Sequence, residues 1–209
     1  MIYAENILIC IAVPLLVSLF FVTKSAKRFV AGFLIGMAVC LIGAYIGGFF
    51  NYVSSMPEGD TSIFISPMIE EIMKLLPLLF YLLIFIPANR DLLMVSIGIG
   101  AGFATFENCC YILSAGAESL PYVMIRGLAV GVMHIICAFA ISMGLIILRR
   151  FKAMSFAGIT GALSLSATFH ALYNLLVSKP GLSSWIGYAM PLLSAVILYV
   201  PFKRSDLTD

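Results

Sequence analysis

The feature that most constrains this chain is a series of apolar stretches, each roughly 18 residues or longer, that follow one another from end to end. About 20 apolar residues form a helix that crosses the ~30 Å hydrocarbon core of a membrane, because each helical residue rises about 1.5 Å. Only 11% of the residues are charged and the mean hydropathy is +1.11, whereas about a quarter of an ordinary soluble domain is charged. The sequence therefore predicts an all-α integral membrane protein.

Charged and turn residues divide the chain into seven predicted transmembrane helices. The expected spans are residues 6–22, 29–50, 63–86, 92–113, 122–148, 154–177 and 185–202. The first stretch has no basic segment before it and no small-residue cleavage site, so we interpret it as a retained helix rather than a signal peptide. Residues 1–209 are expected to form a single transmembrane domain.

The basic residues that flank the predicted spans indicate the orientation of the chain, because short cytoplasmic loops carry an excess of Lys and Arg. The side that holds the C-terminus has nine of them: Lys24, Lys27, Arg28, Arg90, Arg149, Arg150, Lys152, Lys203 and Arg204. The opposite side has only Arg126 and Lys179. This distribution predicts an outside N-terminus and a cytoplasmic C-terminus. It also accounts for the net charge of +2, so we expect the lipid bilayer, and not nucleic acid, as a partner.

The most informative residues are ionisable side chains inside the predicted spans, where each charge costs at least about 2.5 kcal/mol to insert. They are Glu70, Glu71 and Lys74 in the third span, Glu107 in the fourth, Arg126 and His134 in the fifth, and His170 in the sixth. Counted from the outer helix ends, the carboxylates and imidazoles of these four helices lie roughly 9 to 18 Å deep. Because the four depths agree, the sequence predicts a single polar site in the outer leaflet.

An alternative explanation is that each of these residues is satisfied locally. Glu70 and Lys74 are four residues apart, which is the spacing of a helical ion pair, and each histidine can bond to a backbone carbonyl. Arg126, near the end of its span, is expected to be an interfacial anchor. Local pairing explains the residues one by one but not their shared depth, so we favour the common site.

Helical spacing places further residues beside this layer. Phe103, Glu107 and Tyr111 share one face of the fourth span, and Asn174 lies one turn after His170. Two pairs of glycines four residues apart are expected to let helices approach closely: Gly98 with Gly102, and Gly127 with Gly131.

A carboxylate and two imidazoles at one level can activate water in two ways. Two histidines and a glutamate can bind Zn²⁺ and leave a position open for water. Alternatively, without a metal, a glutamate can act as general base while a histidine and an asparagine polarise a substrate carbonyl. Both interpretations predict peptide hydrolysis inside the membrane. The H-E-x-x-H zinc motif is absent from the sequence, so both stay open.

Four motifs on consecutive spans resemble those of a known family. Residues 70–74 read E-E-x-x-K, residues 103–107 read F-x-x-x-E, His134 stands in the next span, and residues 170–174 read H-x-x-x-N. Their order and spacing resemble the PrsW intramembrane proteases, which are relatives of the CAAX prenyl endopeptidase and Abi superfamily. The resemblance covers residues 67–176, where we expect the catalytic core.

The resemblance implies a protease of the bacterial cell membrane that cleaves a single-span anti-sigma factor on its outer side. Such a cleavage begins a cascade that releases a sigma factor in response to envelope stress. The residues that the resemblance implies as essential are Glu70, Glu71, Glu107, His134 and His170.

Roles within this set follow only in part. His134 and His170 are expected to bind a metal ion or to polarise the substrate carbonyl, with Asn174 as oxyanion donor. Glu107 is expected to be a third ligand of Zn²⁺ or a partner that orients the ligands, and Glu71 a further ligand or the base. Helical spacing pairs Glu70 with Lys74 and leaves Glu71 as base or ligand, whereas the prenyl endopeptidases favour the first glutamate as base, so the two are not separated.

The main alternative from another class is a transporter or channel, since intramembrane Glu, Lys and His also mark ion pathways. A continuous pathway needs polar residues in both leaflets, whereas the cytoplasmic halves of the third to sixth spans are nearly free of them. A non-catalytic scaffold that binds partner helices through its glycines is a further alternative. The single polar layer favours the protease.

Overall fold

The computed structural model describes residues 24–54, 56–115, 119–150 and 155–204, which are almost entirely helical. The elements in chain order are α2 (Lys24–Ser54), α3 (Glu58–Asp60), η1 (Thr61–Ile65), α4 (Ser66–Phe85), α5 (Asn89–Ala115), α6 (Leu120–Arg150), α7 (Ser155–Val177) and α8 (Leu182–Arg204). The described part contains no β-strand, which confirms the all-α prediction. The predicted first span, residues 6–22, lies outside the described residues, so the total of seven spans stays a prediction.

The long helices of the described part correspond to the predicted second to seventh spans. By length and composition, Ala26–Ser54, Asn89–Ser114 and Leu120–Arg149 are able to cross a membrane. Helix α4 is as apolar as these helices but carries three charged residues within one span, Glu70, Glu71 and Lys74. Several helices extend beyond the predicted spans, since hydropathy marks the lipid-buried part of a helix whereas its backbone hydrogen bonds continue further.

The predicted third span is divided at its start. The π-helical turn η1 covers Thr61–Ile65, and α4 begins at Ser66. Pro67 lies in the first turn of α4, where its missing N–H is not needed. Thr61 Oγ1 donates a hydrogen bond to Asn51 Oδ1 of α2 at 2.8 Å, which ties η1 to α2. Since π-helical turns are rare and occur frequently at functional sites, the position of η1 just before two carboxylates is notable.

Helices α2 and α5 cross in close contact because glycines of α5 face the backbone of α2. A Cβ atom added at Gly98 or Gly102 would collide with that backbone, which confirms the predicted role of this pair. At Gly127 and Gly131 no atom of the described helices lies within 4 Å of an added Cβ, so the same prediction for this pair stays a prediction. Glycine spacing marks a flat helix face but does not guarantee that a partner helix covers it.

We expect Gly102→Ala to lower the free energy of unfolding by about 1–3 kcal/mol, because overpacking forces the two helices apart. The apparent Tm of the purified protein in detergent measures the effect. Gly47→Ala in α2 is the matched control, since a Cβ there meets no described atom within 4 Å and alanine favours helix. Equal stability of the two variants would contradict the close approach of α2 and α5.

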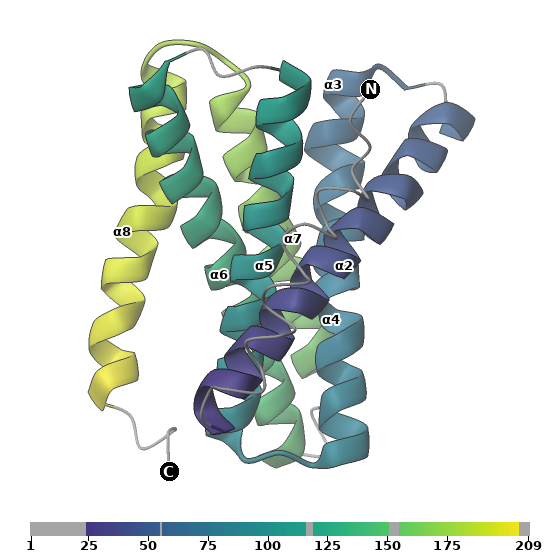
Figure 1. Cartoon of the computed structure of the whole chain (residues 1–209), viewed down its shortest axis with the longest axis vertical. Coiled ribbons are helices and arrows are strands. Elements are labelled where there is room, and N and C mark those ends of the chain that lie inside the picture. Colours follow the sequence, from purple (N-terminus) through teal and green to yellow (C-terminus); the bar gives the residue numbers. More distant parts are fainter. Residues whose placement is uncertain (1–23, 55, 116–118, 151–154, 205–209) are drawn as a thin grey trace.

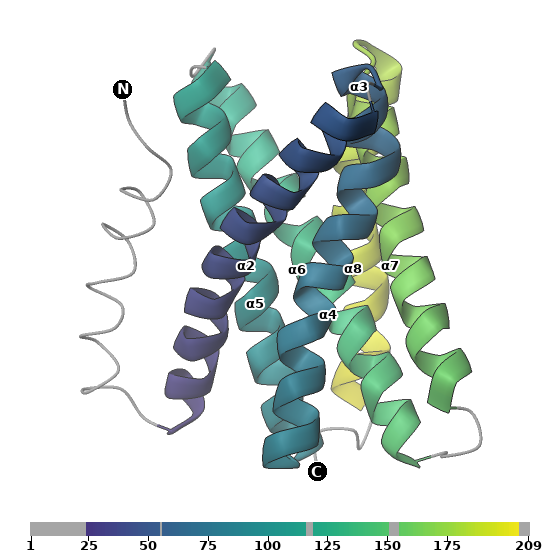
Figure 2. The same ribbon diagram turned by 90° about the vertical axis from the view of Figure 1, so that its right-hand side faces the viewer.

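An apolar core joins the second half of α4, the first half of α5 and the second half of α6, which are the lower parts of these helices in Figure 1. Its fully buried members include Leu78 of α4, Leu92 and Ile99 of α5, and Ile141 and Leu145 of α6. Figure 2 shows α2 crossing α5 obliquely, with the upper ends of α5 and α6 apart from those of α2 and α4. The ionisable residues of the predicted site on α4 to α7 lie above this core.

Candidate active site

Five of the predicted site residues, from four helices, meet inside the upper half of the bundle. They are Glu70 and Glu71 of α4, Glu107 of α5, His134 of α6 and His170 of α7. Both histidines are buried, and their rings lie edge to face with centroids 4.9 Å apart. The prediction that these residues form one polar site is confirmed.

Glu71 is fully buried and links α4 to α7. Its Oε1 accepts a hydrogen bond from Lys74 Nζ at 2.6 Å and lies 2.8 Å from His170 Nδ1. The predicted pairing of Lys74 with Glu70 is therefore wrong. Neighbours at i,i+3 and at i,i+4 are both close on a helix, but Glu71 shares the buried face with Lys74, whereas the side chain of Glu70 is 20% exposed. The Lys74 ammonium also lies 4.6 Å from the centre of the Phe103 ring, which adds a cation–π contact.

A second carboxylate, that of Glu107, holds the other histidine. Its Oε2 lies 2.5 Å from His134 Nε2, and its Oε1 lies 3.7 Å from Arg126 Nη2. The side chain of Glu107 is 33% exposed, whereas that of His134 is fully buried. Each histidine therefore has one ring nitrogen held by a carboxylate from a neighbouring helix.

Arg126 belongs to this network. Its guanidinium carbon lies 3.5 Å from the centre of the Tyr111 ring, and its side chain is only 15% exposed. These contacts favour a place in the polar network over the expected role of interfacial anchor. The hydroxyls of Tyr111 and Tyr122 lie 3.1 Å apart. Phe103, Glu107 and Tyr111 all contact residues of the site or of this network, as their shared helix face predicts.

Asn174 lies one turn after His170, but its amide contacts η1. Its Nδ2 donates a hydrogen bond to the backbone oxygen of Ser62 at 3.0 Å, so its role as oxyanion donor stays a prediction. Sequence reasoning missed Ser62, because a backbone carbonyl leaves no signal in a sequence. It also missed Tyr173, whose buried hydroxyl has no hydrogen-bond partner among the described residues; the available signal was a tyrosine close to His170 in an apolar span.

The remaining polar atoms of the cluster form a group that fits a metal ion. One oxygen of Glu70 and one ring nitrogen from each of His134 and His170 lie within 4.8 Å of one another. Glu70 Oε2 and His134 Nδ1 are buried and have no hydrogen-bond partner in the described part of the chain, which is costly unless something binds there. Two histidines and one carboxylate are the ligand set of many catalytic zinc sites.

The structure departs from the predicted ligand set in its choice of carboxylate. The sequence-based set names Glu71 and Glu107 as ligands, with Glu107 alternatively as an orienting partner. In the structure Glu71 contacts His170 Nδ1 and Glu107 contacts His134 Nε2, and the contact of Glu107 fits the second of its two expected roles. Glu70 is the carboxylate grouped with the two histidines, and its Oε2 lies 3.7 Å from His170 Nε2. Glu71 and Glu107 instead occupy the outer positions from which carboxylates commonly orient metal-binding histidines.

Comparison with known families agrees with this geometry. The pattern of the PrsW family of intramembrane metalloproteases matches residues 24–202, which is most of the 209-residue chain. The chain belongs to the PrsW family. The match extends beyond the predicted core of residues 67–176 and includes α2 and most of α8. No curated protein and no solved structure matches this PrsW family member.

In this PrsW family member, we expect Glu107→Ala to weaken metal binding or activity by about 10- to 100-fold, the usual effect of removing a carboxylate that orients a histidine ligand. The change frees His134 Nε2 from its contact with Glu107. Metal affinity is measured by competition with a chromogenic chelator. Asp60→Ala removes an exposed carboxylate as the control. An affinity equal to that of this control would show that Glu107 does not orient His134.

Proposed function

We propose that this protein hydrolyses a peptide bond of a single-span membrane protein near the outer face of the bacterial cell membrane. The observation that carries the proposal is the buried group of Glu70, His134 and His170, whose ligand atoms lie within 4.8 Å of one another. An ion pathway would need polar groups beyond this layer. The half of the bundle below it is filled by the apolar core, with Ser96 and Ser142 bonded to each other, which favours the protease over the transporter.

The ion that we propose is Zn²⁺, held by Glu70, His134 Nδ1 and His170 Nε2. A bound zinc ion supplies Lewis-acid polarisation and lowers the pKa of water at its open position to about 7. The formal charge of the site supports a cation: three carboxylates face only two cationic side chains, Lys74 and Arg126. The remaining negative charge attracts a divalent ion strongly because the surroundings are apolar.

The neighbouring side chains fix where the protons lie. Because an ionised carboxylate only accepts hydrogen bonds, we assign a proton to His134 Nε2, which faces Glu107, and to His170 Nδ1, which faces Glu71. The other ring nitrogens then keep free lone pairs. Glu71 Oε2 is buried and has no hydrogen-bond partner among the described residues. We assign to this atom the transfer of a proton from the attacking water to the leaving amine. Lys74 holds the carboxylate of Glu71 in place.

The arrangement of the helix ends supports the proposed orientation of the chain. The start of α2, the start of α5 and the ends of α6 and α8 carry the basic residues, and Figure 1 shows these ends at the bottom of the bundle. Arg28 of α2 forms an ion pair with Asp91 of α5 at 2.7 Å at this level. A cytoplasmic bottom and an outside top follow from the excess of positive charge, which puts the catalytic group nearer the outer face.

Substrate access is proposed from this outer side. Glu70 and Glu107 are the more exposed members of the cluster, with side chains 20% and 33% exposed, whereas both histidines are buried. A segment of a substrate helix that unwinds near the outer surface presents its carbonyl to this side. From the family resemblance, we propose an anti-sigma factor as the substrate and a first, outer-side cleavage in envelope-stress signalling as the role.

The proposed function is tested by cleavage of a single-span substrate reconstituted into the same liposomes. Wild type is expected to cut it, and both His170→Ala and a strong chelator are expected to abolish the cut. Asp60→Ala, which changes an exposed acid outside the cluster, is expected to cut like wild type. Cleavage by His170→Ala at the wild-type rate would refute the site. Proton flux through the same liposomes without cleavage would favour the transporter.

A further inference from the structure

Two buried hydrogen-bond donors beside the catalytic group have no acceptor among the described residues. They are Nε of Arg126 and the hydroxyl of Tyr173. Tyr173 is 2% exposed, and the side chain of Arg126 is 15% exposed. A buried donor without an acceptor destabilises the fold, so the pair indicates that an oxygen atom of a ligand binds there.

The two donors lie near each other and near the catalytic group, although they come from different helices. The Tyr173 hydroxyl of α7 interacts electrostatically with Arg126 of α6 and with Glu107 of α5. Arg126 Nη2 lies 3.7 Å from Glu107 Oε1, and the other oxygen of Glu107 contacts His134. Arg126 precedes His134 by eight residues, and Tyr173 follows His170 by three. Under the proposed orientation, both donors therefore lie on the outer side of the histidines.

A pocket of about 500 Å³ adjoins the donors, between the start of α6, the end of α7 and the start of α8. Tyr122 lines it, and the Tyr122 hydroxyl lies 3.1 Å from that of Tyr111, whose ring lies against the guanidinium of Arg126. Tyr188 also lines it and packs against the buried cluster that contains Tyr173. The pocket thus offers room for a segment of extended chain next to the donors.

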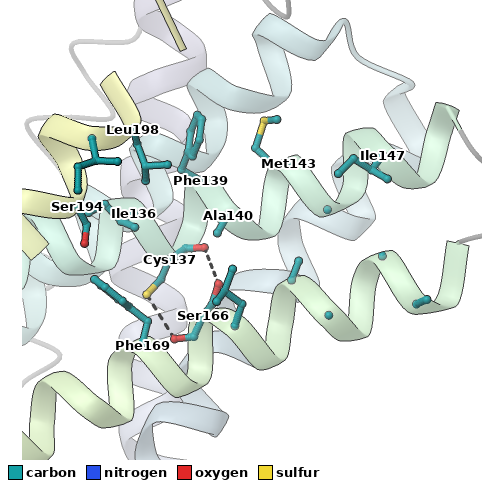
Figure 3. A pocket seen from close by; sticks show the side chains of 17 residues that line it. Ile136, Cys137, Phe139, Ala140, Met143, Ile147, Ser166, Phe169, Ser194 and Leu198 are labelled. Carbon is teal, nitrogen blue, oxygen red and sulfur yellow. Dashed lines mark hydrogen bonds between the residues drawn. The ribbon is translucent and has the colours of Figure 1, made fainter. Parts of the chain in front are cut away.

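Contacts one turn below the histidines join the two helices that carry the donors. Ser166 Oγ of α7 donates a hydrogen bond to the backbone oxygen of Cys137 of α6 at 3.1 Å, and Cys137 Sγ lies 3.6 Å from the backbone oxygen of Ser166. Figure 3 shows both contacts between α6 and α7. Because the helices are fixed against each other at this level, the donors are held in position before a ligand binds.

The chemistry of the donors favours an uncharged main-chain carbonyl as the ligand. A transmembrane helix that is cut has to unwind locally, and its unwound residues then present carbonyl groups without a partner inside the helix. In apolar surroundings such carbonyls are costly unless the enzyme supplies donors. An acidic side chain fits less well, because the positive charge of Arg126 is already offset by Glu107.

We propose that Arg126 Nε and the Tyr173 hydroxyl donate hydrogen bonds to one main-chain carbonyl of the unwound substrate, on the outer side of the bond that is cut. This inference rests on the proposed function and deepens it, since the enzyme then recognises an unwound backbone and not a particular side chain. Tyr188 lies between the pocket and the cluster that holds Tyr173, so its side chain has to shift as the segment binds.

Cleavage kinetics of a reconstituted single-span substrate, with metal at saturating concentration, test the role of Tyr173. Tyr173→Phe removes only the hydroxyl and is expected to raise KM about 3- to 10-fold with kcat unchanged, because the bond is made equally to the bound substrate and to the transition state. Its apparent Tm is expected to stay the same or rise, because a buried donor without an acceptor is removed. Tyr81→Phe, in the apolar core of α4, is the matched control and is expected to have the wild-type KM.

Arg126→Lys tests the second donor, because lysine keeps a positive charge beside Glu107 but lacks the Nε–H group. It is expected to raise KM about 3- to 10-fold and to leave the metal affinity unchanged. The double variant with Tyr173→Phe is expected to raise KM by less than the product of the two single effects, because both donors bind one carbonyl. An effect equal to the product would mean that the donors bind separate atoms, contrary to the proposal.

The outcomes separate this inference from the proposed function. If wild type cuts the substrate and Tyr173→Phe keeps the wild-type KM, or lowers the apparent Tm, the inference is overturned and the protease remains. Loss of metal from Arg126→Lys would likewise overturn it, since Arg126 would then act through Glu107 and His134. If wild type cuts no single-span substrate, the proposed function fails and this inference fails with it.

Discussion

With metal at saturating concentration, Glu71→Gln is expected to keep its metal ion but to lose cleavage by about 10²- to 10⁴-fold, the usual loss when a general acid–base group is removed. Glu70→Gln is expected to lose metal and cleavage together. The difference arises because Glu70 supplies one of the grouped ligand atoms. Glu71 instead contacts His170 Nδ1, whereas the proposed metal ligand of this ring is Nε2. Two adjacent glutamates are thereby assigned distinct roles.

Three measurements separate these outcomes: metal content after gel filtration, metal affinity by chelator competition, and cleavage of a reconstituted single-span substrate. Because Glu71 also orients His170, Glu71→Gln is expected to weaken metal affinity by about 10- to 100-fold, which saturating metal overcomes. Asp60→Asn, an exposed acid, is the control for charge. Loss of metal from Glu71→Gln but not from Glu70→Gln would exchange the two roles.

The cluster itself was predictable from the sequence because the membrane makes each buried charge expensive. Glu70, Glu71, Glu107, His134 and His170 stand out against apolar spans, and their similar depth predicts that they meet. The all-α fold follows from the same cost, since a spanning helix satisfies its own backbone hydrogen bonds. Neither prediction needs knowledge of how the helices are rotated.

The pairing within the cluster was not predictable, because it depends on those rotations. Lys74 is near both Glu70 and Glu71 on an isolated helix, and only the burial of one face selects Glu71. From its position near a helix end, Arg126 is expected to be an interfacial anchor, whereas in the structure Tyr111 of α5 lies against it. The choice of Glu70 as a ligand likewise follows from which histidine nitrogens Glu71 and Glu107 occupy.

Contacts between distant segments left no signal in the sequence. Asn174 meets a backbone carbonyl of η1, and a π-helical turn has no composition of its own. The glycine pairs illustrate the same limit: Gly98 and Gly102 face α2, whereas Gly127 and Gly131 have the same spacing but face no described helix. Spacing shows what a helix face permits, and only the fold shows what lies against it.

Lys74→Met is expected to lower the free energy of unfolding by about 3–5 kcal/mol, the usual cost of removing one partner of a buried ion pair. Lys74 and Glu71 are both fully buried, and their contact is 2.6 Å long. Without the ammonium, the carboxylate of Glu71 keeps its contact with His170 but loses its cationic partner. The measurement is the apparent Tm and the denaturant midpoint of the purified protein in detergent, with Lys179→Met as the control for loss of an exposed lysine.

The double variant Lys74→Met with Glu71→Gln decides whether the loss comes from the uncompensated carboxylate or from packing. Removing both charges is expected to recover most of the stability, because a buried ion pair replaced by uncharged residues of similar size is often no less stable. The double variant still lacks the cation–π contact with Phe103, at 4.6 Å, which contributes about 0.5–2 kcal/mol. We expect this part of the free energy of unfolding not to be recovered. A double variant as unstable as Lys74→Met would mean that lysine supports α4 through its packed stem, and Glu71 would then be held in place chiefly by His170.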